Sequence, residues 1–383
     1  MAGRGRNMNR AWKIPFNRPV LVGREIEYVQ QAIAEGHISA GGSFTEKCQD
    51  LLRDSLNAEA VILTTSGTHA LEIAALLLDI APGDEVIMPS FTFVSTANAF
   101  ALRNARIIFA DIRSDTLNID EEQLPSLLSE RTRAVVPVHY GGVACEMDVI
   151  DELCGSRGIT VVEDNAHGLF ATYRGKYLGT LGKMAALSFH ETKNVTCGEG
   201  GALIINDQSL ISRAEIIRDK GTNRSRFLKG EVDRYTWVSL GSSYQPSDML
   251  AAYLLAQLEK RYEIAKKRSL LWNRYMDGLC DWAVNNSVRL PTVPDGCGHS
   301  AHIFYLLMPD QTSRDTLIER LRRKGILAVF HYQPLHLSEM VKESFECPVT
   351  ESVASRLVRL PLYFGLEETE QDSVIKEVRN LKL

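Results

Sequence analysis

The sequence predicts an α/β fold in which a large, doubly wound, mostly parallel sheet is followed by a smaller C-terminal α/β domain. Short apolar runs alternate with helix-length stretches between about residues 20 and 250. Several of these runs lack the polar alternation of a half-exposed strand, as in parallel sheets that are buried on both faces. The pattern then changes after one long helix. A chain of 383 residues, 45% of them hydrophobic, can bury one large core and a second, smaller one.

The large domain is expected to consist of repeated strand–helix units. Strands are expected at residues 85–89, 106–111, 134–139, 160–163 and 201–206. Helices are expected at residues 120–128, 148–157 and, as one long helix, 247–277. The smaller domain is expected to contain a strand at 303–308, a helix at 314–324 and a strand at 326–330. We therefore predict a flexible tail over residues 1–13, a large domain over 14–260 and a small domain over 261–383.

The composition argues against several classes of protein. A net charge of −5 does not suit a general nucleic-acid binder. The seven cysteines are odd in number and form no C-x-x-C pair, so a disulfide or zinc framework is not expected. No apolar run is long enough to span a bilayer, and the basic residues 1–10 lack the apolar segment of a signal peptide. We expect a cytoplasmic protein that binds neither nucleic acid nor membranes.

Two residues together suggest pyridoxal phosphate chemistry. Asp164 ends an apolar strand, and Lys193 follows 29 residues later in a glycine-rich stretch. A carboxylate at a strand end can lie under a pyridine nitrogen and keep it protonated, so that the ring accepts electrons from a carbanion. A lysine amine can condense with the cofactor aldehyde and later serve as a base. Each residue alone is commonplace, so the prediction depends on a phosphate site nearby.

A phosphate site is predicted at the start of a helix. Ser66 is placed as an N-cap, and apolar residues at helical spacing follow it. The amides of Gly67 and Thr68 would point at the anion, and the missing side chain of Gly67 permits close approach. Ser188, five residues before Lys193, could add a hydroxyl. An ordinary capped helix is the alternative if this segment is considered alone.

These motifs occur in the order found in a known enzyme family. They are Ser66-Gly67-Thr68 and residues 89–98, 137–142, 161–167, 188–194 and 241–248. From Ile14 onward the chain resembles the DegT/DnrJ/EryC1/StrS nucleotide-sugar aminotransferases, which are fold type I pyridoxal phosphate enzymes. Residues 83–100, 138–148, 188–194 and 329–336 look most like the branch of this family that aminates C4 of dTDP-4-keto-6-deoxyglucose.

The resemblance implies roles for individual residues. Lys193 matches the lysine that binds the cofactor covalently, and Asp164 matches the acid under the pyridine nitrogen. Phe93 matches the aromatic residue that stacks on the ring, although the alternation of Phe91 and Phe93 also suits core packing. The residues that match phosphate contacts are Gly67, Thr68 and Ser188.

Two positions depart from the common pattern of the family. His167 occupies a position where the family more often has Gln beside the phenolic oxygen of the cofactor. A histidine can form the same hydrogen bond, but its tautomer and charge become variables. Ser243 occupies a position where many relatives carry an Asn that reaches the cofactor phosphate of the neighbouring subunit. The shorter side chain weakens that contact, although the branch named above shares it.

The substrate is expected to meet a further set of residues. The resemblance implies that His331 and Tyr332 face the sugar or nucleotide, and that the loop carrying Tyr244 crosses to the partner in a homodimer with shared active sites. Arg224 and Arg226 lie in a basic loop that suits a diphosphate. No metal is expected, because His331 and His336 do not share a helical face and no carboxylate completes a site.

The sequence thus predicts a pyridoxal phosphate-dependent aminotransferase that passes an amine from glutamate to a dTDP-linked 4-keto-6-deoxyhexose. Amination at C3, or formation of another epimer, stays open. A dehydratase branch carries His in place of the lysine, so Lys193 argues against it. A non-catalytic pyridoxal phosphate sensor is the alternative from another class, although no DNA-binding helix pair or appended domain supports it.

Overall fold

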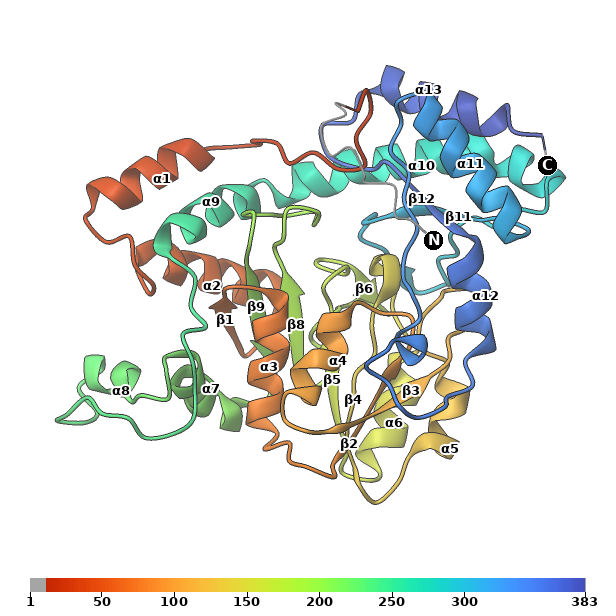
Figure 1. Cartoon of the computed structure of the whole chain (residues 1–383). Helices are drawn as coiled ribbons and strands as arrows, with labels where there is room; N and C mark the ends of the chain where they lie inside the picture. Colours follow the sequence, from red (N-terminus) through yellow and green to blue (C-terminus); the bar gives the residue numbers. More distant parts are fainter. Residues whose placement is uncertain (1–11, 383) are drawn as a thin grey trace.

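A computed structural model of the protein describes residues 12–382, so the tail predicted over residues 1–13 lies outside the described residues except for its last two. A seven-stranded sheet occupies the centre of the large domain, with helices packed on both of its faces (Figure 1). Its strands in chain order are β1 Ala60–Thr64, β2 Glu85–Pro89, β3 Arg106–Ala110, β4 Thr132–Val135, β5 Thr160–Asp164, β8 Met184–Ser188 and β9 Gly201–Ile205.

The strand order is β1-β9-β8-β5-β4-β2-β3. Neighbours from β8 to β3 are parallel, while β9 is antiparallel to both β1 and β8. The predicted mostly parallel α/β sheet is therefore confirmed. All five strands expected in this domain are present, although the one expected at 134–139 runs from Thr132 to Val135 and ends before His139. Strands β1 and β8 were not predicted.

Both faces of the sheet are buried, which explains the continuous apolar runs. In β8, Met184 and Ala186 pack in a cluster with helices on one face, while Ala185 and Leu187 pack in a second cluster on the other face. Successive side chains of a strand point to opposite faces, so every residue of such a strand must be apolar. The helices of this domain are α1 Glu25–Ala34, α2 Ser43–Leu56, α3 Gly67–Leu77, α4 Val94–Ala101, α5 Leu124–Leu127, α6 Met147–Gly155, α7 Ile211–Arg218, α8 Arg224–Leu228 and α9 Asp248–Glu259.

The single long helix predicted over residues 247–277 is wrong. The structure has two helices, α9 and α10 (Arg261–Asn285), with non-helical backbone at Lys260 (φ −94°, ψ 9°). Helix α9 buries its apolar residues against α1 and α2, whereas α10 buries residues such as Tyr275 in the C-terminal core. Each helix follows the direction of its own core, and this tertiary requirement has no local sequence signal. The predicted domain boundary at residue 260 stays a prediction.

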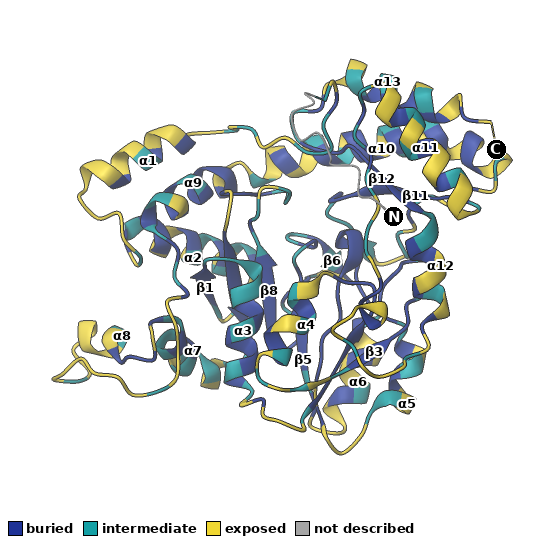
Figure 2. Ribbon diagram, in the orientation of Figure 1, coloured by how far each residue is buried: buried dark blue, intermediate teal, exposed yellow. Residues whose placement is uncertain are grey.

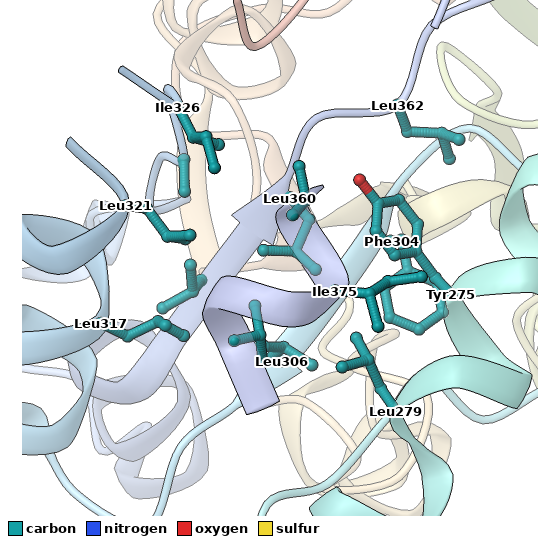
Figure 3. Close-up of a cluster of buried hydrophobic side chains, with 14 of the residues drawn as sticks. Tyr275, Leu279, Phe304, Leu306, Leu317, Leu321, Ile326, Leu360, Leu362 and Ile375 are labelled. Carbon is teal, nitrogen blue, oxygen red and sulfur yellow. The ribbon is translucent and has the colours of Figure 1, made fainter. Parts of the chain in front are cut away.

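The C-terminal part contains a two-stranded antiparallel sheet of β11 (Phe304–Leu307) and β12 (Leu357–Leu360), covered by α11 (Gln311–Arg323), α12 (Pro348–Arg356) and α13 (Glu368–Arg379). The strand predicted at 326–330 is wrong: Ile326 and Val329 form isolated bridges to Ile14 and Arg359. The strand that pairs with β11 comes from the far end of the chain. Figure 3 shows the core here, where Tyr275 and Leu279 of α10 meet Phe304, Leu360 and Ile375.

Three short strands form a small separate sheet, in the order β10-β6-β7. They are β6 Thr172–Tyr173, β7 Lys176–Tyr177 and β10 Cys297–Gly298. The helix predicted at 120–128 is a 3-10 turn followed by the one-turn helix α5. Helix α8 and its flanking loops extend away from the sheet and are largely exposed (Figures 1 and 2). Among residues 12–382, no helix is both long and apolar enough to cross a membrane.

Candidate active site

A cavity of about 500 Å³ lies beside the carboxyl ends of β5 and β8. Parallel strands commonly place their ligand sites at this edge of a sheet. Nine residues predicted from the sequence line the cavity: Gly67, Thr68, Phe93, Asp164, His167, Ser188, Lys193, His331 and Tyr332. The fold thus brings together side chains from segments spread over most of the chain.

Strand register places Asp164 and Lys193 at the same edge. Asp164 is the last residue of β5 and lies in register with Ala186 of the parallel strand β8. Strand β8 ends two residues later at Ser188, and the loop that follows carries Lys193 before the chain returns as β9. Both side chains line the cavity as a result.

The carboxylate of Asp164 is buried and held from two sides. The Thr96 hydroxyl donates to Oδ2 at 2.7 Å, and the Ala166 amide donates to Oδ1 at 3.2 Å. Thr96 is itself fully buried and lies 2.8 Å from the Thr92 hydroxyl. Asp164 therefore has a fixed orientation, as an acid that must meet one ring nitrogen requires. Sequence reasoning missed Thr96, because a threonine on a short helix has no signal of its own.

Lys193 is an amine suited to attack a carbonyl. Burial lowers its pKa to about 8, although Asp164 acts in the opposite direction, and the charge of Arg359 lowers it further. A lysine with this pKa is partly neutral near neutral pH, and the neutral amine is the nucleophile. Its backbone amide donates to the His190 carbonyl at 2.9 Å, which fixes the loop.

The predicted anion site at the start of α3 has the expected local structure. Ser66 is the N-cap, and its hydroxyl accepts from the His69 amide at 3.1 Å. A Cβ on Gly67 would lie 3.1 Å from both the Leu187 carbonyl oxygen and Ser188 Cβ, so glycine allows the turn to approach β8. The Thr68 hydroxyl lies 2.7 Å from that of Ser95, which also lines the cavity.

Gly201 is a second glycine on which this turn depends, and no local pattern of residues predicts its role. It lies in register with both Thr64 of β1 and Ser188 of β8. A Cβ at this position would lie 2.4 Å from the Gly67 nitrogen. Only glycine therefore lets β9 pass beneath the anion site.

Phe93 and Phe91 have different environments, although they are two residues apart. Phe91 is 1% exposed in a hydrophobic cluster, whereas Phe93 is 57% exposed and lines the cavity. Strand β2 ends at Pro89 and Phe93 is the N-cap of α4, so the two residues do not follow the alternation of a strand. The core-packing alternative holds for Phe91 only. An apolar ring open to the cavity suits a planar partner.

His167 has one tautomer fixed by its surroundings. The Gly141 amide donates to its Nδ1 at 3.3 Å, so this nitrogen carries no proton. Burial holds the pKa of the ring well below its usual range, and the ring is therefore neutral. The proton then lies on Nε2, which is 3.4 Å from the Tyr332 hydroxyl. His167 thus presents an N–H donor to the cavity, as a Gln amide would.

The cavity wall formed by residues 331–332 also contains Arg359, a residue that sequence reasoning missed. The His331 ring stacks on Tyr332 with centroids 4.7 Å apart, and the Arg359 guanidinium donates to a nitrogen of His331. His336 instead lies 2.6 Å from the Ser90 hydroxyl. Within the described part of the chain, no group of three or more His, Cys, Asp or Glu side chains could hold a metal ion.

Four predicted residues lie outside this cavity. Ser243 is exposed, and Arg224 and Arg226 belong to the outlying helix α8. Tyr244 is buried in the core, and its hydroxyl donates to Glu72 at 3.0 Å, so the substrate contact predicted for it stays a prediction. Tyr244 instead packs on His69 of α3, with ring centroids 5.0 Å apart. This tyrosine supports the helix that carries the anion site.

The residues present fit pyridoxal phosphate. The α3 N-terminus with Ser188 would hold the phosphate, Phe93 would cover one ring face, and Asp164 would meet the ring nitrogen. His167 supplies a donor for the phenolic oxygen, and Lys193 supplies the amine. All of these residues line the same cavity.

Comparisons with known proteins agree with this arrangement. The family model for the DegT/DnrJ/EryC1/StrS aminotransferase family matches residues 19–379. The chain belongs to the DegT/DnrJ/EryC1/StrS aminotransferase family. The predicted fold type, enzyme class and cofactor of this family are thereby confirmed.

Solved structures of several other proteins are similar to this chain over nearly its whole length. The aminotransferase TlmJ from Streptoalloteichus hindustanus is 32% identical, with a TM-score of 0.89 over 96% of this chain and 98% of that one. A family member from Brucella abortus is 29% identical, with a TM-score of 0.84 over 93% and 94% of the two chains. DesV from S. venezuelae is 29% identical, with a TM-score of 0.84 over 93% of each chain.

Proposed function

We propose that this aminotransferase transfers the amine of L-glutamate to C4 of dTDP-4-keto-6-deoxy-D-glucose and forms dTDP-4-amino-4,6-dideoxy-D-galactose. The proposed transfer chemistry is inferred from one observation, which is that Lys193, Asp164 and the N-terminus of α3 line the same cavity. The sugar assignment is supported by the resemblance of residues 83–100, 138–148, 188–194 and 329–336 to the branch with this substrate.

When bound, pyridoxal phosphate would supply an electron sink for the carbanion that forms as the amine is transferred. The chain's own residues would do the rest. Lys193 Nζ takes a proton from the substrate carbon in one half-reaction and returns a proton in the other. Its lowered pKa, about 8, lets it exchange a proton near neutral pH.

Asp164 and His167 would orient the reacting group. The Asp164 carboxylate is kept in place by Thr96 and attracts a proton to the opposing ring nitrogen. The Nε2–H of His167 would donate a hydrogen bond into the cavity, and the Gly141 amide fixes the orientation of the imidazole ring. Neither residue has to reorganise during the reaction, because both are held by hydrogen bonds to their neighbours.

The substrate would lie along His331 and Tyr332, with Arg224 and Arg226 of a partner subunit on its diphosphate. We propose a homodimer because these arginines and Ser243 lie outside the chain's own cavity. The segment around α8 also exposes large apolar side chains, which suits burial against a second copy. The exposed residues are Phe227, Leu228, Tyr235, Trp237, Val238 and Leu240. Sedimentation should give twice the chain mass. The cytoplasmic location stays a prediction.

The reaction product tests this proposal. The purified protein should be yellow, and borohydride should remove the visible band and fix the cofactor to Lys193. With glutamate and dTDP-4-keto-6-deoxyglucose, NMR should show an axial amine at C4. An equatorial amine would assign the enzyme to a sister activity, and an amine at C3 would reject the branch. Label on Lys176, Lys183 or Lys220 would refute the site itself.

A further inference from the structure

His336 joins the loop that carries His331 and Tyr332 to the end of strand β2. Its ring Nδ1 lies 2.6 Å from the Ser90 hydroxyl, and its backbone amide donates to the same Ser90 oxygen at 3.2 Å. The Leu335 amide donates to the Ser90 carbonyl at 3.1 Å. Both His336 and Ser90 are buried. Three hydrogen bonds therefore link two residues of this loop to a single serine.

The other ring nitrogen of His336 fixes which way the imidazole faces. Nε2 lies 3.3 Å from Oε1 of Glu351, which belongs to helix α12. A carboxylate oxygen accepts hydrogen bonds, so Nε2 carries a proton and donates it. The Ser90 hydroxyl can then donate to Nδ1 while its oxygen accepts from the His336 amide. The ring is thus held at both nitrogens, and rotating it would break both hydrogen bonds.

The order serine, histidine and glutamate matches that of a hydrolytic triad, but the position of the serine excludes that use. Ser90 is 0% exposed, and its hydroxyl oxygen already accepts from the His336 amide. A nucleophilic serine has to reach the carbonyl of a substrate. The three residues therefore connect elements of the fold and do not attack a substrate.

The turn that begins at Ser90 belongs to the cofactor side of the cavity. Ser90 follows β2 directly, and its amide donates at 3.0 Å to the carbonyl of the last residue of β3. Thr92 and Phe93 come next and line the cavity. The Thr92 hydroxyl lies 2.8 Å from that of Thr96, which donates to Asp164. Ser90 is thus fixed to the large sheet, beside the residues that would meet the cofactor.

His331 and Tyr332 lie between two anchors of their loop. Upstream of them, Val329 pairs with β12 through two backbone hydrogen bonds, of 3.1 and 2.7 Å. Downstream of them, Leu335 and His336 are bound to Ser90. The upstream anchor belongs to the C-terminal part and the downstream anchor to the large sheet. The downstream anchor therefore sets where these two residues lie relative to the cofactor side.

The Tyr332 ring contacts the turn after Ser90. Its centroid lies 5.6 Å from that of Phe91 and 6.4 Å from that of Phe93. Tyr332 also lines the cavity, together with His331. Residues that orient a bound substrate must themselves be held by their neighbours. For this part of the wall, the contacts with Ser90 supply that support.

We propose that His336 is a positioning residue for the ketosugar, because it holds the loop of residues 331–336 against Ser90 and so places His331 and Tyr332 beside the cofactor side of the cavity. This inference rests on the proposed function and names a residue on which its sugar recognition depends. The effect is exerted through His331 and Tyr332, and no bond of the substrate changes at His336.

Two variants separate the roles of the ring nitrogens. In His336→Asn the side-chain oxygen takes the place of Nδ1 and can still accept from Ser90, whereas in His336→Gln the amide takes the place of Nε2 and reaches only Glu351. We expect His336→Gln to raise KM for dTDP-4-keto-6-deoxyglucose about tenfold, the range of one hydrogen bond, with kcat and cofactor binding within about threefold of wild type. His336→Asn should keep KM within about threefold. The reverse order of the two variants would overturn the proposal.

Ser90→Ala removes the same contact from its other end. It should raise KM as His336→Gln does, and the double variant should show no further rise, because the two residues act through one contact. Thr350→Val is the matched control: Thr350 is fully buried on α12, and its hydroxyl donates at 2.7 Å to Asp111, which follows β3. It should lower the melting temperature and leave KM unchanged. Additive effects of Ser90→Ala and His336→Gln, or an equal rise of KM in Thr350→Val, would overturn the proposal.

Hydrogen exchange tests the anchor without any substrate. Exchange in peptides that cover residues 329–336 is followed by mass spectrometry on the holoenzyme. It should be faster in His336→Gln than in wild type and unchanged in His336→Asn and Thr350→Val, because a loop that loses an anchor opens more often. Unchanged exchange in His336→Gln would overturn the proposal. If wild type aminated no ketosugar while this exchange pattern appeared, the proposed function would fail and the anchoring by His336 would stand.

Discussion

Two parts of the cavity wall differ in how their polar groups are held. In the first part, formed by β5, α3 and the loop after β8, polar side chains accept hydrogen bonds from their neighbours. In the second part, formed by residues 331–332 and β12, aromatic rings surround an arginine that has few hydrogen-bond partners. Asp164 accepts from Thr96 and Ala166, and Ser66 caps α3. Among residues 12–382, Arg359 has no carboxylate as an ion-pair partner, and its Nε has no hydrogen-bond partner. The first part is preorganised for one resident group, whereas the second keeps bonding capacity free for substrates that come and go.

The largest expected effect is on the first part. Lys193→Ala should lower turnover by at least about a thousandfold, because it removes both the covalent attachment and the proton carrier. The variant should still bind pyridoxamine phosphate, since the contacts of α3 and Phe93 remain. Steady-state kinetics and a binding titration check both statements. Lys183→Ala is the control, because Lys183 pairs with Asp207 at 3.0 Å and does not line the cavity.

Asp164→Asn should lower turnover by about a hundredfold. A loss of two pKa units in the proton affinity of the ring nitrogen corresponds to about 3 kcal/mol. Kinetics of both half-reactions should show the same loss, because the ring nitrogen has the same role in each. Activity within about threefold of wild type would show that the acid is structural.

Thr96→Val should lower turnover by about tenfold, the range expected for one hydrogen bond to a charged group. Thr96→Ser should restore most of it, because the hydroxyl that donates to Asp164 returns. The pH titration of the cofactor's visible absorbance should shift in the valine variant and not in the serine variant. A loss of activity without this spectral shift would mean that Thr96 only supports packing.

The pH dependence of cofactor uptake reports on Lys193. Its pKa is lowered from 10.5 to about 8, so the neutral amine is the minority form below pH 8 and the majority form above it. Uptake of pyridoxal phosphate by the apoprotein should therefore rise about fivefold between pH 7 and pH 8 and level off above that. Stopped-flow absorbance measures this rate. A rise that continues to pH 10 would mean that Lys193 keeps the pKa of an exposed lysine.

The smallest expected effect is that of His167→Gln. Turnover should stay within about threefold of wild type, because the Gln amide donates a hydrogen bond as the Nε2–H of His167 does. The absorbance maximum of the bound cofactor and the kinetics check this expectation. A tenfold loss would show that the imidazole ring itself is required, and that a hydrogen-bond donor alone does not suffice at this position.

The periodicity and residue types of the sequence determined the α/β class and the five predicted strands of the large sheet. They also indicated Asp164, Lys193 and the start of α3 as candidate cofactor contacts, whereas Phe93 and His167 were indicated only by the resemblance to the family. These features depend on short stretches of chain, in which burial on both faces or an N-cap leaves a local pattern. Domain boundaries and the roles of individual site residues stay predictions.

Tertiary structure decided the rest. The break at Lys260 follows from two cores with different directions, and β12 pairs with β11 across some fifty residues of chain. Thr96, Gly201 and Arg359 have no local signal, because the partner of each lies far away in the sequence. The hydroxyl of Thr96 donates to Asp164, and Gly201 lies against the turn at Gly67. Arg359 lines a cavity whose other residues come from distant segments of the chain. The sequence contains these residues, but only the packing of the folded chain brings each of them next to its partner.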